Sequence, residues 1–297
     1  MSKRPPFTAR KAGFIALCLL PGVVFVALFT YYPMIRGNVI AFQRYNLFDI
    51  TATPFVGLEN FRAVLAEPRF WTALRNTGVW VAVSLFFQFF LGFGLALLLR
   101  RHFRGRGLYQ AWVFFPWAMS GFLIGLLWRW MCNGQFGVIN DLLLKAGIID
   151  ERIGFLASPG WAMTSVIIAN VWYGVTFFAI MIIAALQSVP KELYEAAAVD
   201  GASRLRRFWH VTLPHIRPTL ALIVLLRIIW ILNFPDLIYA MTGGGPAGST
   251  DIVTTFLIQQ VAGGDYGRAG AVGLLALGLL LAFSVFYLNA TRFEKAR

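Results

Sequence analysis

Charge, cysteine and histidine are all scarce in this sequence. Only 13% of its 297 residues are charged, and it contains 13 acidic residues, 3 histidines and 2 cysteines. Cys18 and Cys132 give neither a disulfide framework nor the ligand spacing of a metal site. No cluster of cysteines or carboxylates accompanies the histidines, so we expect no metal in this chain.

Motifs for nucleotide binding and for hydrolysis are also missing. The sequence contains no G-x-x-x-x-G-K-(S/T) phosphate loop and no Gly-x-Ser-x-Gly nucleophile elbow. Without a phosphate loop the chain has no evident means of holding ATP. We therefore expect no enzyme and no cofactor in this chain, and any energy for its function has to come from a partner.

Apolar sequence, in contrast, is abundant. Hydrophobic residues make up 59% of the chain and the mean hydropathy is +0.69, too apolar for a soluble domain. A helix needs about 20 apolar residues to cross a bilayer. The sequence thus predicts an all-α integral membrane protein with six transmembrane helices within residues 12–291. Their expected ranges are 12–35, 76–99, 107–130, 160–186, 218–240 and 269–291.

The distribution of charge predicts how these helices are oriented. Six spans put both termini on one side, which holds 16 of the 26 basic residues and 4 of the 13 acidic ones, a net +12. The other side has 8 of each. Basic residues favour the cytoplasmic side, so residues 1–11, the loop 187–217 and both termini are predicted to be cytoplasmic. This topology accounts for the net charge of +13 without a nucleic-acid partner.

The loop at 187–217 is a charged, turn-broken element between two apolar spans. Lys191 to Val199 are good helix formers, and Pro190 before them is a helix-start signal. Asp200-Gly201 supplies a terminal glycine that can adopt a positive φ. Ser203 can cap a second helical stretch, which Pro214 is expected to stop.

The first of these helices exposes Glu195, Ala196 and Ala197. Small alanines let a partner approach closely, and a glutamate can pair with a partner's arginine in a partly desolvated groove. The alternative is that Glu-Ala-Ala is only good helix-forming sequence. A glutamate, an Asp-Gly bend and a Leu-Pro pair at these separations in a cytoplasmic loop favour the partner site.

These residues resemble the EAA signature of the membrane subunits of bacterial ATP-binding-cassette (ABC) importers. The matching residues are Glu195-Ala196-Ala197, Asp200-Gly201-Ala202, Phe208 and Leu213-Pro214. Further motifs resemble the MalF/UgpA-type carbohydrate permeases of the binding-protein-dependent transport systems. They are Val56-Gly57-Leu58-Glu59-Asn60-Phe61, Asn76-Thr77, Val171-Trp172, Ala185-Leu186-Gln187 and Gly244-Gly245-Pro246.

The resemblance implies the type I ABC importer permease fold and a role as the permease subunit of a carbohydrate importer. In this family the EAA loop seats in a cleft of the ATPase subunit, which makes Glu195, Ala196, Ala197, Asp200 and Gly201 the expected coupling residues. The implied partners are a second homologous permease, two ATPase subunits that bind ATP and Mg, and a periplasmic or lipid-anchored solute-binding protein. The implied location is the bacterial inner membrane, in contact with its lipids.

Arg227 is the most informative ionisable residue inside the predicted spans. It lies about ten residues, or about 15 Å, into the fifth span, near the bilayer middle. The resemblance places substrate contacts on Arg227, Trp230, Ile231 and Phe234, whose spacings of 3, 4 and 7 share one helical face. It also places them on Gly174 and Phe177 of the fourth span, beside Trp172 and Tyr173.

Aromatic rings with one arginine suit a sugar that bears an anionic group. The hypothesis is therefore an anionic carbohydrate derivative that carries a phosphate, sulfonate or carboxylate. The alternative is that Arg227 pairs with Asp236 or a carbonyl and only holds helices together.

Two other classes of function remain as alternatives. An ion-gradient-driven secondary transporter of a small polar solute would need inverted repeats and paired intramembrane acids, and Asp236 is the one acid available. A membrane-embedded enzyme would need clustered acids, bases or metal ligands, which the sequence lacks. The carried sugar itself cannot be deduced from these residues.

Overall fold

The computed structural model describes residues 9–49, 51, 53–100 and 103–291. Within these ranges every regular element is a helix, apart from three isolated β-bridges, which confirms the all-α class. The chain divides into two compact units. One is Met1–Ala66 with Gln260–Leu274, and the other is Glu67–Gln259 with Leu275–Arg297.

The first unit contains a long apolar helix and a loop that is fixed by one asparagine. The helix runs through α1 (Ala9–Val26), the π-helical turn η1 (Ala27–Tyr31) and α2 (Tyr32–Ile40), five residues beyond the expected end. After it, the loop leads to α3 (Glu59–Ala66). Asn60 donates to the carbonyls of Ala41 and Gln43, at 2.9 Å each. The asparagine of the Val56-to-Phe61 motif therefore holds this loop against the helix end.

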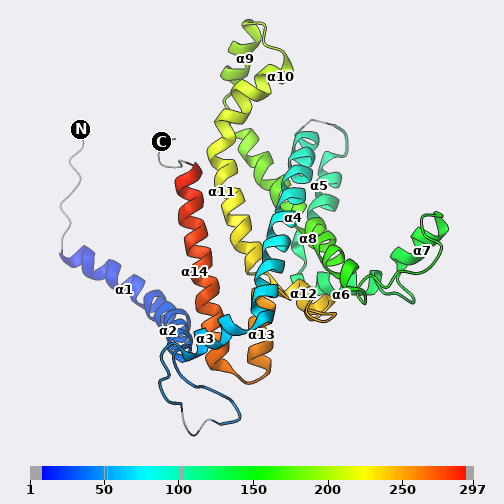
Figure 1. The fold of residues 1–297 in the computed structure, drawn as a ribbon. Helices are drawn as coiled ribbons and strands as arrows, with labels where there is room; N and C mark the ends of the chain where they lie inside the picture. Colours follow the sequence, from blue (N-terminus) through cyan, green and yellow to red (C-terminus); the bar gives the residue numbers. More distant parts are fainter. Residues whose placement is uncertain (1–8, 50, 52, 101–102, 292–297) are drawn as a thin grey trace. The chain divides into compact units, whose positions relative to one another are not determined.

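Three long helices build the second unit, and Figure 1 shows them running beside one another: α4 (Pro68–Leu99), α8 (Pro159–Gln187) and α11 (Leu213–Leu232). α4 and α8 approach each other closely at Gly92, where a Cβ would lie 2.5 Å from the Cβ of Phe178. Large apolar residues from α8 and α11 fill the space beside this crossing. Its fully buried members are Phe178, Ile182, Leu186, Ile216 and Ile223.

Two spans that the sequence predicts as single helices are broken. The expected helix at 107–130 is α5 (Arg106–Phe114), the 3-10 turn η2 (Phe115–Ala118) and α6 (Gly121–Met131), bent by 99°. The expected helix at 218–240 ends at Leu232 and restarts as α12 (Pro235–Met241).

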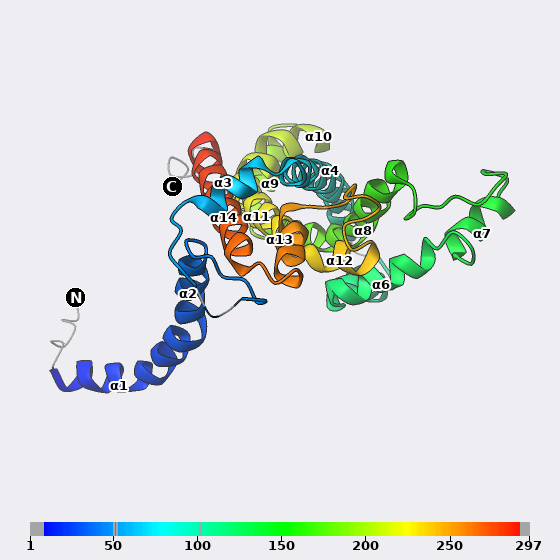
Figure 2. The same cartoon turned by 60° about the horizontal axis from the view of Figure 1, so that its bottom comes forward.

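α6 and α12 lie side by side, as Figure 2 shows. Gly125 lets them approach, because a Cβ there would be 2.6 Å from the Cβ of Ala240. Glycine-mediated helix packing of this kind is common in membranes. The segments that follow the two breaks thus pack against each other.

The helix that leads into α11 also differs from expectation. α10 (Arg204–Arg207), the π-helical turn η3 (Phe208–Thr212) and α11 are continuous, so Pro214 does not stop the helix. In a regular α-helix the proline ring clashes with the carbonyl four residues before it. The wider π-helical turn directly before Pro214 relieves that clash.

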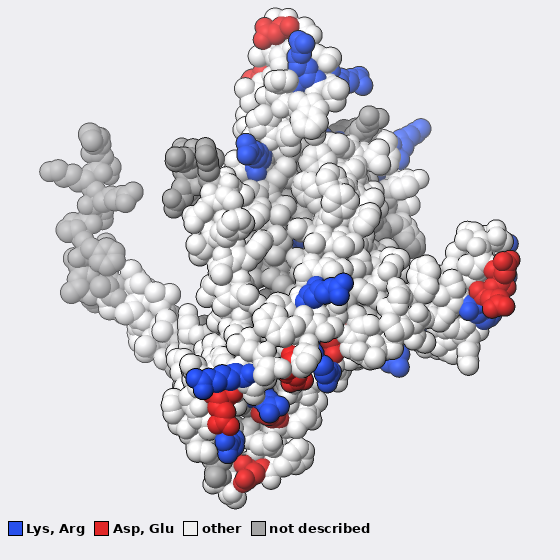
Figure 3. Space-filling view, viewed as in Figure 1, with Lys and Arg blue, Asp and Glu red and all other residues white. Residues whose placement is uncertain are grey.

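Five of the described helices are long and apolar enough to span a membrane, and the bent pair brings the number to six. The other elements are short: α7 (Val138–Lys145), α9 (Lys191–Val199) and α13 (Val253–Ala262), while α14 (Tyr266–Thr291) is the last span. The sequence predicts a plain loop where α13 lies. In Figure 3 the charged atoms of the second unit gather at the two ends of its long helices, as expected for membrane-crossing segments.

Candidate functional site

The loop that carries the EAA signature forms the helix α9 (Lys191–Val199), which lies beyond the ends of α8 and α11 (Figure 1). The helix ends in a turn of the Schellman type, in which Ala202 N donates to Ala197 O (2.9 Å) and Gly201 N donates to Ala198 O (3.1 Å). Gly201 has φ +72°, a conformation that glycine adopts without strain. Asp200 and Gly201 thus define where the exposed helix stops.

Glu195 and Ala196 are exposed on α9, and Ala197 is half-buried. Glu195 forms no ion pair with any described residue of the chain. Beside it, Val199 is 88% exposed. A carboxylate and an apolar side chain that are both left uncovered are features of a surface that receives a partner.

Gly201→Ala is expected to weaken this surface moderately. A side chain in the left-handed region costs about 1 to 2 kcal/mol, which favours fraying at the end of α9. If α9 is the ATPase-coupling helix that the sequence resemblance implies, ATP-driven uptake measured in proteoliposomes should fall about threefold to tenfold.

Gly147 offers a matched control for this change. It ends α7 in the same turn, with φ +66°, Gly147 N bonded to Leu144 O and Ile148 N bonded to Leu143 O, and both glycines have open space around them. Gly147→Ala should add the same strain and leave uptake unchanged. An equal loss of uptake in both variants would mean that the turn at Gly201 has no special role.

The second candidate region is built around Arg227 of α11. The residue is 3% exposed, and its Nε donates to Gln88 Oε1 of α4 at 2.7 Å. Its guanidinium carbon lies 5.7 Å from the ring centroids of both Tyr173 and Phe177. Neither Arg227 nor Asp236 takes part in any of the four ion pairs between described residues, so the pairing with Asp236 that was considered as an alternative is not formed.

Gly174 makes room for this arrangement. A Cβ on Gly174 would collide with the side-chain amide of Gln88 and with a terminal nitrogen of Arg227. The two polar side chains therefore occupy the space beside α8 that a larger residue would fill. Glycine at this position allows a charged group and its hydrogen-bond partner to meet inside the helix bundle.

Most of the predicted substrate residues come together here. Tyr173 and Phe234 stack with centroids 5.3 Å apart, and Phe177 lies 5.2 Å from Trp230. Tyr173, Gly174, Phe177, Arg227, Trp230 and Phe234 thus form one cluster with Gln88, which is bonded to Arg227; it is called below the midplane cluster. Phe234 does not continue the helical face of Arg227, because α11 ends two residues earlier; it reaches Tyr173 from the break instead.

Trp172 and Ile231 lie outside the midplane cluster. The ring of Trp172 packs on Trp128, with centroids 6.0 Å apart. Ile231 is 1% exposed in an apolar core with Trp80 and Leu237, and its carbonyl accepts a hydrogen bond from Trp80 Nε1. Ile231 is therefore in a packing position, whereas Trp172 is 38% exposed.

Three buried polar residues in or near the midplane cluster were not predicted. Gln88 donates to the carbonyl of Asn170 at 2.8 Å, and Asn170 itself is fully buried with neither side-chain polar atom hydrogen-bonded. Ser84, one turn before Gln88, also has a buried hydroxyl without a partner. Buried polar groups usually have a hydrogen-bond partner, so these side chains are further candidates for contact with a ligand. The sequence does carry a signal for these three residues, because each is a polar residue within a charge-free apolar run. The prediction considered only the ionisable residues inside the spans.

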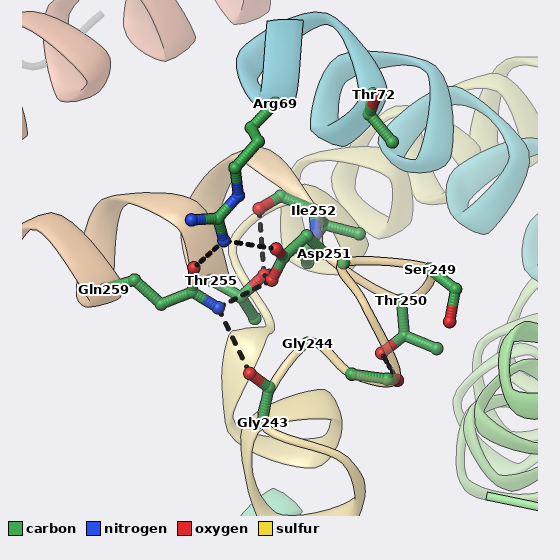
Figure 4. A network of polar contacts seen from close by, with 12 residues as sticks. Arg69, Thr72, Gly243, Gly244, Ser249, Thr250, Asp251, Ile252, Thr255 and Gln259 are labelled. Atoms are coloured by element: carbon green, nitrogen blue, oxygen red, sulfur yellow. Dashed lines mark hydrogen bonds and ion pairs between the residues drawn. The ribbon is translucent and has the colours of Figure 1, made fainter. Parts of the chain in front are cut away.

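A polar network, drawn in Figure 4, lies at the end of the second unit opposite to α9. Asp251, 3% exposed, accepts from Gln259 Nε2 at 2.7 Å and pairs with Arg69 at 3.2 Å. Gly244, with φ +92°, lies so close that a Cβ would collide with Asp251. Asn76 donates to the carbonyls of Gly248 and Ser249. The Asn76-Thr77 and Gly244-to-Pro246 motifs are therefore parts of one structure, which fixes the loop after α12.

Comparisons with known proteins find relatives over nearly the whole chain. Residues 88–295 match the family described as binding-protein-dependent transport system inner membrane component. The trehalose/maltose transport system permease protein MalF of Thermococcus litoralis is 35% identical over 96% of both chains. The sulfoquinovosyl glycerol transport system permease protein SmoG of Agrobacterium fabrum is 33% identical over 93% of this chain and 89% of the relative.

A solved structure is similar over nearly the whole length as well. It is a chain of a bacterial ABC transporter involved in the import of the acidic polysaccharide alginate. The similarity has a TM-score of 0.83 and 27% sequence identity, and covers 95% of this chain and 96% of the other. The expected type I ABC importer permease fold is confirmed by this match.

Proposed function

Because this chain belongs to the family of binding-protein-dependent transport system inner membrane components, we propose that it is the membrane-spanning permease subunit of an ATP-driven carbohydrate importer. The observation that carries the proposal is Glu195, which is exposed and forms no ion pair with any described residue, on the helix α9 that the turn at Gly201 terminates. Relatives named for trehalose/maltose and for sulfoquinovosyl glycerol, and a structure named for alginate, support a carbohydrate cargo.

The chain works with partners that supply the energy and the cargo. A solute-binding protein delivers the carbohydrate, a second homologous permease completes the pathway, and two ATPase subunits bind ATP and Mg. The exposed face of α9 receives one ATPase subunit, and its displacement drives alternating access of the bundle. The complex lies in the inner membrane, with α9 and both termini on the cytoplasmic side, where the positive-inside rule puts the basic loops.

The cargo carries an anionic group, which the midplane cluster recognises. Arg227 is buried without a carboxylate among the described residues, and burial of an uncompensated charge costs several kcal/mol. The rings of Tyr173 and Phe177 and the amide of Gln88 offset part of this cost. A phosphate, sulfonate or carboxylate on the sugar balances the rest of the buried positive charge of Arg227. The side-chain amide of Asn170 provides a further hydrogen-bond donor and acceptor.

Uptake by a reconstituted complex tests the proposed function. The chain, its second permease, the ATPase subunits and the loaded binding protein are placed in proteoliposomes, and labelled carbohydrate is measured inside. We expect uptake that requires ATP on the ATPase side and is unaffected by ionophores that collapse ion gradients. Uptake by the chain alone, driven by an ion gradient, would establish the secondary transporter instead.

A further inference from the structure

Tyr194 lies next to Glu195 on α9, but its side chain contacts other residues of this chain. It is half-buried, as is Ala197, whereas the other residues of α9 are exposed. Its hydroxyl is hydrogen-bonded to the hydroxyl of Thr212 at 2.9 Å. The guanidinium carbon of Arg100 lies 5.2 Å from the centroid of its ring, a cation–π distance.

These two contacts reach the ends of two different long helices. Arg100 is the C-terminal cap residue directly after α4, and Thr212 is the last residue of the π-helical turn η3, from which α11 starts. Thr212 is 2% exposed, so its hydrogen bond with Tyr194 is shielded from solvent. Single π-helical turns occur often at functional sites and allow a helix to bend.

The same two helices hold the polar pair of the midplane cluster. Gln88 lies twelve residues before Arg100 on α4, about 18 Å along the axis, and Arg227 lies fifteen residues after Thr212, about 22 Å. Their side chains are joined by the 2.7 Å hydrogen bond from Arg227 Nε to Gln88 Oε1. A displacement of α4 relative to α11 therefore changes the geometry of this pair.

We propose that Tyr194 is the positioning residue that transmits the displacement of α9 to α4 and α11, and thereby to the Gln88–Arg227 pair. The proposal rests on the proposed function, since it presumes an ATPase subunit that moves α9. Glu195 faces that subunit. Tyr194 lies on the same turn of helix and faces the bundle, so this turn connects the ATPase subunit with the bundle. The hydroxyl fixes α9 to the turn at which α11 can bend, and the ring fixes it to the end of α4.

The coupling ratio, molecules imported per ATP hydrolysed, measures this role in the complete complex. Tyr194→Phe removes the hydroxyl and keeps the ring over Arg100, and Thr212→Val removes the other half of the bond. A hydrogen bond of this kind corresponds to about fivefold in an equilibrium, so we expect each variant to lower the ratio about fivefold. The double variant should lower it no further, because both changes break one contact.

Tyr287 provides the matched control. It is also a half-buried tyrosine whose hydroxyl donates to the carbonyl of Ala221 in α11 at 2.9 Å, but it lies on α14. Tyr287→Phe should leave the coupling ratio unchanged. An equal fall in this variant would overturn the inference, because it would mean that any loosening of α11 uncouples transport.

Further outcomes separate the inference from its premise. A Tyr194→Phe complex with the wild-type coupling ratio would contradict the role of Tyr194 and leave the proposed function intact. The same holds for a Tyr194→Phe complex that loses its ATPase subunits on purification. A wild-type complex whose uptake does not require ATP would remove the proposed function itself. The expected result is a Tyr194→Phe complex that keeps its subunits and its ATP hydrolysis while imports per ATP decrease.

Discussion

Glu195→Lys is expected to reduce ATP-driven uptake about 100-fold or more while the chain still inserts and folds. Glu195 is exposed and forms no ion pair with the described residues, so its replacement removes nothing that holds the bundle together. At a partner surface, a lysine would face the cation that the glutamate pairs with. Losing a partly buried ion pair and placing a like charge there costs about 3 kcal/mol or more of interaction free energy. This corresponds to a factor of about 100 in an equilibrium constant. Uptake and co-purification of the ATPase subunits are measured together.

Glu192→Lys is the control for this charge reversal. Glu192 lies three residues earlier on the same short helix, is also exposed, and changes the net charge by the same amount. It forfeits only a favourable interaction with the helix N-terminus, worth about 0.5 kcal/mol. Equal losses of uptake in the two variants would mean that α9 needs negative charge in general and that Glu195 is not a specific contact.

The local part of the coupling loop was predictable because its signals act over a few residues. Gly201 adopts the positive φ that follows an Asp-Gly helix end, and Ser203 accepts a hydrogen bond from Arg206 N at 3.3 Å as the cap of α10. Tyr194 gave no such signal, since its role depends on Thr212 and Arg100, far away in sequence. Which residues of a short helix face inward is decided by what packs beneath it.

The breaks in the third and fifth predicted spans show the limit of hydropathy. Apolar runs establish that a segment belongs in the membrane, yet they do not say whether it stays straight. The Phe-Pro-Asp sequence at 234–236 indicates a break, because the residue before a proline is driven out of helical geometry, and the structure has it there. The 99° bend between Ala118 and Gly121 depends on packing against α12 and on the close contact at Gly125, which sequence periodicity does not reveal.

The midplane cluster was predictable in its aromatic and charged members but not in its polar ones. Arg227 is conspicuous because an ionisable group inside a span is costly. Gln88 and Asn170 cost less, so they attract less attention in an apolar run, although they are fully buried. Only the structure shows that Gln88 is the residue to which Arg227 is bonded and that Gly174 makes space for both.

Arg227→Gln is expected to lower uptake of an anionic carbohydrate about 100-fold while the assembled complex remains intact. A bidentate pair between a guanidinium and an anion consists of two charge-assisted hydrogen bonds, each worth about 1.5 to 3 kcal/mol. Glutamine can still hydrogen-bond Gln88 but cannot balance the negative charge of the cargo. Uptake is measured in parallel with a neutral analogue of the same sugar, for which the loss should be at most a few fold.

Arg227→Met separates cargo recognition from helix packing. Methionine fills similar volume without charge, and replacing a buried charged group by an apolar one is often neutral or stabilising. If Arg227 binds the anion, this variant unfolds at the wild-type temperature or above and yet fails to import the anionic sugar. If Arg227 only holds α4 and α11 together through Gln88, uptake of the anionic and neutral sugars falls equally or not at all. The ratio of the two uptake rates is therefore the measurement that decides whether the buried charge serves the cargo.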